Sequence, residues 1–146
     1  MQLKKIMVSL GALICLCVNS GVAAYAETTT SFVDNGISLA YEIANDPISD
    51  LSICDKTAYC TSSTSGINAV SITVTQTLQK YWGLWIWNGV DGAEWTRTVN
   101  YNSINLSNSK SNLESGTYRV KSVFTLTDKN GKSETITVYS NEMKVS

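Results

Sequence analysis

Four tryptophans between residues 82 and 95 are the side chains best suited to bind a ligand. Trp82, Trp85, Trp87 and Trp95 are the only tryptophans in the chain of 146 residues. Flat aromatic faces stack on sugar rings and on partner loops, and tryptophan is enriched where binding energy concentrates. Because Gly83 lies beside the first two, we expect Trp82 and Trp85 to be exposed binding residues, and Trp87 and Trp95 to pack inward as structural residues.

Two carboxylates in the same segment, Asp91 and Glu94, raise the question of glycoside hydrolysis. A glycosidase needs one carboxylic acid with a raised pKa inside a deep cleft. Asp91 is followed by Gly92, a pair typical of a solvated turn or bulge. We therefore predict that these acids are not catalytic and that the protein is not an enzyme.

The chain contains no histidine. Ser/His/Asp and Cys/His nucleophilic sites, a histidine general base and a histidine-ligated zinc are therefore excluded. Asp46 and Asp50 lack the dense oxygen pattern of a calcium loop. Neither a metal nor a cofactor is predicted.

The first 26 residues have the order of a secretory signal peptide. Lys4 and Lys5 precede an apolar stretch at 6–18, which is followed by the small-x-small cleavage site Ala24-Tyr25-Ala26. The apolar stretch is shorter than a spanning helix of about 20 residues, and no later stretch is long enough to anchor the product. We predict cleavage after Ala26 and a secreted, extracellular protein without a stable membrane anchor.

The charge of the chain argues against nucleic acid as a partner. The formal net charge is −1, and removal of Lys4 and Lys5 would lower it to −3. A surface that binds phosphates needs clustered Lys and Arg, whereas the lysines here are scattered among acids. We expect an unknown glycan or protein as the partner, and the sequence does not indicate the oligomeric state.

Cys54 and Cys60 are the two cysteines outside the signal peptide, since Cys15 and Cys17 lie within it. In an oxidising exterior such a pair favours a disulfide over a metal site, which would need four soft ligands. We predict a Cys54–Cys60 disulfide if the chain turns between residues 55 and 58. In one extended strand the two Cα atoms would stand about 20 Å apart, too far for a bridge.

Apolar and polar residues alternate along most of the remaining chain, as in half-buried strands. Residues 27–35 are polar and are expected to form a flexible lead to a single domain at 36–146. We interpret Asn45-Asp46-Pro47 as a break, residues 62–66 as a loop and residues 128–132 as a hairpin turn. Strands are expected at 37–43, 70–81, 95–101, 104–106, 118–126, 136–138 and 143–145. Residues 48–53 lead into the less regular segment 54–60, which could form a strand, a turn and a return strand.

This spacing, without helical periodicity outside the signal peptide, predicts an all-β fold: an antiparallel immunoglobulin/fibronectin-III-like β-sandwich of seven to eight strands. The segment from Leu113 to Tyr118 has the Leu, Gly and Tyr spacing of a tyrosine corner. We therefore expect Tyr118 to be structural, with its hydroxyl bound to the backbone near 113–115.

The turn within the tryptophan segment has two possible positions. Asn88-Gly89 is a dipeptide favoured in type I′ hairpin turns. Alternatively, the chain turns at Trp82-Gly83, with Gly89 and Gly92 as bulges in a long return strand. The residues alone leave both open.

The stretches 72–80, 115–122 and 132–140, with a tryptophan-containing strand after the first, resemble a family of small secreted immunoglobulin-like domains of Gram-positive (Bacillota) gut bacteria. The resemblance covers most of the mature chain. It implies that residues 87–95 form one strand paired with the strand of Leu78, which favours the Trp82-Gly83 turn. The function of that family is uncharacterised, so no site residues carry over.

Two function classes remain. The first is a secreted, non-catalytic binding or interaction module that meets a glycan or protein surface through exposed aromatic residues. The alternative is a structural or self-associating extracellular protein that uses its edge strands.

Overall fold

The computed structural model describes residues 41–146, which form eight β-strands and no helix. The predicted all-β fold and strand number are confirmed. The predicted signal peptide and flexible lead lie outside the described residues. Within the described part, no helix is long and apolar enough to cross a membrane. The strands are β1 (Ala44–Cys54), β2 (Thr57–Gly66), β3 (Ala69–Gly83), β4 (Ile86–Val99), β5 (Ser103–Lys110), β6 (Gly116–Asp128), β7 (Ser133–Tyr139) and β8 (Met143–Val145).

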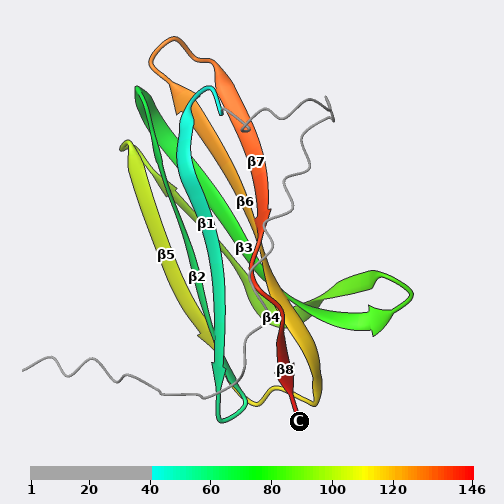
Figure 1. Ribbon diagram of the computed structural model, residues 1–146. Coiled ribbons are helices and arrows are strands. Elements are labelled where there is room, and N and C mark those ends of the chain that lie inside the picture. Colours follow the sequence, from blue (N-terminus) through cyan, green and yellow to red (C-terminus); the bar gives the residue numbers. More distant parts are fainter. Residues whose placement is uncertain (1–40) are drawn as a thin grey trace, which may run out of the picture.

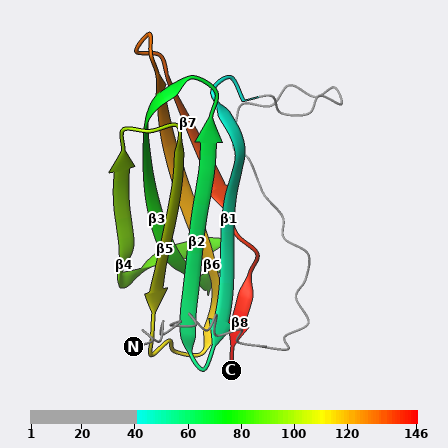
Figure 2. The same cartoon turned by 90° about the vertical axis from the view of Figure 1, so that its left-hand side faces the viewer.

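The strands form two antiparallel sheets that pack face to face (Figure 1). One sheet has the order β1–β2–β5, and the other has the order β4–β3–β6–β7, with β8 paired to β6 beyond the end of β7. Figure 2 shows the three-stranded sheet in front of the larger one. This is the expected immunoglobulin-like sandwich. The β3–β4 hairpin extends past the sandwich and projects from its body, at the right of Figure 1.

The core contains two apolar clusters with a polar layer between them. Along β3, Val74 belongs to one cluster and Leu78 to the other. Gln76, which faces inward between them, is fully buried. The polar layer therefore runs through the middle of the sandwich.

The polar layer is a continuous chain of hydrogen bonds between the sheets. Asn108 Nδ2 donates to Gln76 Oε1 (3.0 Å), and Gln76 Nε2 donates to Ser62 Oγ (2.7 Å). The hydroxyls of Ser62 and Ser122 are 2.7 Å apart, and Ser122 Oγ donates to Ser49 Oγ (2.8 Å). Because Ser122 gives its single proton to Ser49, Ser62 must donate to Ser122. The hydrogen bonds of this network thus all run in one direction, from Asn108 to Ser49. Such a series strengthens each bond and fixes the alignment of the sheets.

β1 does not break at Asn45-Asp46-Pro47, and this prediction is wrong. The register with β2 shifts between Asn45 and Ile48, and Asp46 has a φ of 46°. A bulge at this point removes the proline from the ladder, so the missing N–H costs no hydrogen bond.

The serine- and threonine-rich stretch at 62–66, expected to be a loop, is the end of central strand β2. Its inward hydroxyls have partners in the core. Ser62 belongs to the polar chain, and Thr64 Oγ1 donates to the carbonyl of Asn45 (3.1 Å). Polar composition was misleading here because these hydroxyls are satisfied inside the protein.

The turn of the β3–β4 hairpin is formed by Leu84 and Trp85, since Gly83 pairs with Ile86. Both turn residues have positive φ, 50° and 66°, as in a type I′ turn. Neither expected position is correct. Asn88-Gly89 lies within β4, and the turn begins immediately after Trp82-Gly83. The pairing of β4 with β3 agrees with the implication of the family resemblance.

A large bulge interrupts β4, in the region where glycine bulges were expected. Thr77 pairs with Glu94 and Gln79 pairs with Gly89, so two steps along β3 correspond to five along β4. Gly92, within the bulge, has a φ of 67°. Across this step β4 therefore has three more residues than β3. Side chains alternate between the two faces of a strand, and three is an odd number. Two odd-numbered residues of β4 on either side of the bulge therefore point to opposite faces.

Cys54 and Cys60 do not form the predicted disulfide. A turn is present at residues 55–56, but it makes Cys54 the register partner of Thr57 and Cys60 the partner of Leu51. Paired residues of two antiparallel strands point to the same face, so Cys60 lies on the buried face with Leu51. Cys54 follows Leu51 by three residues in β1 and therefore points to the opposite face. Cys60 is a free, buried thiol, and burial raises its pKa to about 12.

Candidate ligand-binding groove

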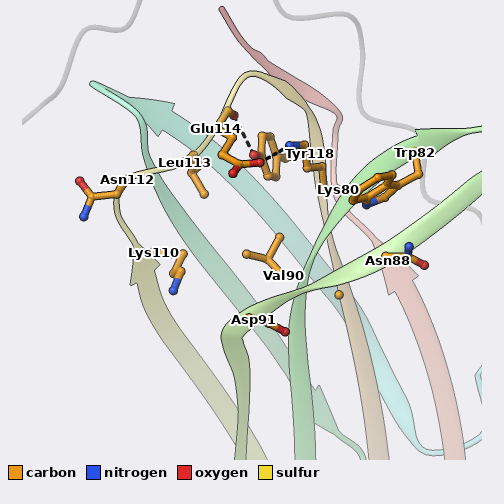
Figure 3. Close-up of a pocket in the computed structure, with 11 residues that line it drawn as sticks. Lys80, Trp82, Asn88, Val90, Asp91, Lys110, Asn112, Leu113, Glu114 and Tyr118 are labelled. Atoms are coloured by element: carbon orange, nitrogen blue, oxygen red, sulfur yellow. Dashed lines mark hydrogen bonds and ion pairs between the residues drawn. The ribbon is translucent and has the colours of Figure 1, made fainter.

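A groove of about 460 Å³ lies at the base of the β3–β4 hairpin (Figure 3). The bulge of β4 forms one wall, and the connection between β5 and β6 forms the other. Its polar lining consists of Lys80, Asn88, Asp91, Lys110, Asn112 and Glu114, and its apolar lining of Trp82, Val90, Leu113 and Tyr118. The groove thus combines side-chain hydrogen-bonding groups with aromatic rings.

Trp82 lies beside this groove and is 69% exposed, as expected. A register shift between Tyr81 and Gly83 leaves Trp82 as the extra residue of a bulge, outside the regular pairing. Figure 3 shows the indole beside Lys80 and across from Asn88. The ring is therefore available for stacking at the open side of the groove.

An ion pair between Lys80 and Glu114 crosses the groove wall. Lys80 Nζ lies 2.9 Å from Glu114 Oε2 and 5.9 Å from the centre of the Tyr118 ring. The hydrogen bond between the two charged groups lowers the pKa of Glu114 and raises the pKa of Lys80. Glu114 is thus held as a carboxylate, which is the wrong form for a general acid.

Gly116 makes room for the lysine of this pair. A Cβ atom at this position would lie 2.7 Å from Cε of Lys80, closer than real contacts allow. The absent side chain lets the Lys80 stem pass across the start of β6 toward Glu114.

Tyr118 forms the expected tyrosine corner. Its ring is buried, and its hydroxyl donates to the carbonyl of Glu114 (2.7 Å), inside the predicted segment 113–115. The corner therefore fixes the loop that carries one wall of the groove.

Trp85 is 89% exposed at the apex of the hairpin, as expected, and Leu84 beside it is 86% exposed. Of Trp82 and Trp85, only Trp82 lines the groove.

Trp87 does not pack into the core, contrary to the prediction. It pairs with Tyr81 on the outer face, where the two ring centres are 5.1 Å apart. The guanidinium carbon of Arg119 lies 4.1 Å from the ring centre of Trp87 and 4.1 Å from that of Tyr139. Arg119 Nε also donates to Gln79 Oε1 (2.9 Å). The four-residue stack stiffens the base of the hairpin.

Trp95 is half-buried and packs against the second core cluster, in agreement with its expected structural role. It is paired with the buried Gln76 and therefore faces inward. The β4 bulge, which lies between Trp87 and Trp95, places these two tryptophans on opposite faces although they are eight residues apart.

The structure separates the two acids considered for glycoside hydrolysis. Asp91 lines the groove, whereas Glu94 accepts a hydrogen bond from Thr77 Oγ1 (3.1 Å) on the outer face of the sheet. They do not form a pair around one bound sugar. Among the described residues, no three or more Cys, Asp or Glu side chains gather as metal ligands.

No protein-family model, curated protein or solved structure matches the chain. The resemblance to secreted domains of gut bacteria stays a prediction.

Most polar residues of the groove escaped sequence analysis. Lys80, Asn88, Lys110, Asn112 and Glu114 come from strands and a loop up to 34 residues apart, and no local motif links them. Only the exposed tryptophans and the glycine-rich bulge indicated this region. The tryptophans and the glycines were recognisable because each group is formed by residues that are close together in the sequence.

Proposed function

We propose that the protein is a secreted, non-catalytic binding module that holds a glycan in the groove beside Trp82. The observation that carries this proposal is the exposed indole next to a polar groove. A sugar offers an apolar ring face to an aromatic side chain and hydroxyl groups to amides, carboxylates and ammonium groups.

The lining of this groove suits the hydroxyl groups of a glycan. Six of its side chains are polar or charged and can donate or accept hydrogen bonds. The Lys80–Glu114 ion pair presents both a donor and an acceptor at the groove wall. The tyrosine corner holds the loop wall in place before a ligand arrives, which lowers the entropic cost of binding.

A printed glycan array tests the proposal with four proteins: the wild type, Trp82→Ala, Trp85→Ala and Thr98→Ala. Thr98 is exposed on the outer face of β4 and is the matched control. We expect the wild type to bind a subset of glycans. Trp82→Ala should weaken binding by about tenfold or more, and the other variants should bind normally. Absence of binding to any printed glycan, or equal binding by Trp82→Ala, would refute the proposal.

A further inference from the structure

The apex of the β3–β4 hairpin carries the two most exposed large hydrophobic side chains of the described residues. Leu84 and Trp85 are almost wholly exposed, and Ile86 is 52% exposed. A Cβ atom built on Gly83 would meet no atom within 4 Å, so the apex is surrounded by open space. Exposed apolar groups gathered in this way mark an interaction site.

The backbone of the turn makes this composition unusual. Leu84 and Trp85 both occupy the left-handed region, which large side chains rarely adopt. Hairpin turns of this type favour Asn-Gly, and such a dipeptide is present four residues later but lies within β4. The chain therefore places two large apolar side chains at an apex where backbone preference alone would select small polar ones.

Chemical groups change in a fixed order along the hairpin axis. The apex carries Leu84 and Trp85, and the next paired rung carries Ile86. Tyr81 pairs with Trp87 one rung further back, and Lys80 follows. The order is an aliphatic and aromatic apex, then aromatic rings with polar edges, then the ammonium group of Lys80 with its partner Glu114. A bilayer presents acyl chains, interface and head groups in the same order.

The dimensions of the hairpin also fit a bilayer interface. Three rungs separate the apex from Lys80, which is about 10 Å at ~3.4 Å per residue. Interfacial segments bury their apolar parts by about 5–10 Å. Residues 76–90 contain no acidic side chain that would oppose entry. An open two-stranded hairpin cannot cross the hydrocarbon core, because its edges would leave backbone groups without partners.

We infer that the hairpin apex inserts into the interfacial region of a lipid bilayer, with Leu84, Trp85 and Ile86 below the head groups. The protein is thereby held reversibly at a membrane surface. This inference rests on the apex residues Leu84, Trp85 and Ile86, none of which lines the groove. It shares only Lys80 and its partner Glu114 with the glycan proposal.

Vesicle flotation tests the inference with the full chain. The probes are vesicles of phosphatidylcholine alone and vesicles containing one part phosphatidylglycerol to about two parts phosphatidylcholine, as a charge test. The proteins are the wild type, Leu84→Ser/Trp85→Ser and the control Ile67→Ser/Tyr101→Ser. Ile67 and Tyr101 are also exposed, 65% and 67%, and lie at the opposite end of β3 and β4. All three proteins carry the same N-terminal residues, so differences between them report on the substituted sites.

We expect the wild type and the control to bind both kinds of vesicle. The vesicle partition coefficient of Leu84→Ser/Trp85→Ser should be at least about tenfold lower, because two apolar side chains that would be buried in the bilayer are lost. Bromine-labelled lipid tails should quench the tryptophan fluorescence of the wild type more than that of this variant. Equal partition of all three proteins, or no binding by the wild type, would overturn the inference. So would lipid-free oligomers that disappear in the apex variant, because they would assign the apex to a second copy of the chain.

Discussion

The hydroxyl of Tyr118 donates a 2.7 Å hydrogen bond to the backbone carbonyl of Glu114, four residues earlier. The side chain of the same Glu114 binds Lys80 of β3. A structural bond of the sandwich and an ion pair of the groove therefore meet at one residue. Fold and candidate site are coupled at this loop.

Replacement of Tyr118 by Phe should destabilise the protein by about 1 kcal/mol, or somewhat more if the Glu114 carbonyl is left without a partner. The ring stays in the core and only the hydroxyl is lost. Urea unfolding measures the difference. An unchanged midpoint would show that the corner contributes nothing to stability.

Ser122→Ala should cost about 1–3 kcal/mol, because it removes the central hydroxyl of the buried polar chain. Ser62 then loses its acceptor and Ser49 loses its donor. Ser107→Ala, at an exposed position of β5, is the matched control. In a double-mutant cycle with Ser62→Ala, the two losses should be less than additive. Strict additivity would mean that the two hydroxyls act independently.

Trp95→Ala should destabilise the protein by about 3 kcal/mol, at the lower end of the range for loss of a buried aromatic ring. Trp87→Ala should cost only about 1 kcal/mol, because it removes a stack on the outer face. Thermal or urea unfolding of both variants compares the two losses. Equal losses would contradict the assignment of these residues to opposite faces.

The stability of the protein should fall as pH rises from about 9 towards 12, in part because of Cys60. Its folded-state pKa of about 12 lies above the ordinary value of 9.0. The unfolded chain therefore releases the thiol proton first, and proton release favours unfolding. Cys60→Ala should remove this contribution, so its urea midpoint should decline less steeply with pH than that of the wild type. Parallel declines would show that Cys60 does not contribute to this dependence.

The fold class could be predicted from sequence because alternation along β3, β6 and β7 reports directly on burial. The polar composition of residues 62–66 wrongly predicted a loop, because the buried hydrogen-bond partners of Ser62 and Thr64 come from other strands. The prediction of a Cys54–Cys60 disulfide was wrong for a related reason. Close spacing in sequence allowed a bridge, but the strand register placed the two side chains on opposite faces.

The candidate site was predictable only where its residues are neighbours in the chain. Exposure of Trp82 and Trp85 followed from the glycine between them. The position of Trp87 did not, because three extra residues in the β4 bulge reverse the faces between it and Trp95. The size of a bulge depends on the pairing of two strands, and sequence alone does not give that pairing.

The most direct measurement of the central claim is a two-dimensional ¹H–¹⁵N NMR titration that follows the indole Nε1–H signals of the four tryptophans. The titrant is the glycan that binds best on the array. The Trp82 signal should shift with saturation, together with backbone signals of Asn88 and Asn112, while the Trp87 and Trp95 signals stay in place. Saturable shifts confined to Trp87 and the outer face, with Trp82 unchanged, would contradict a ligand site in the groove.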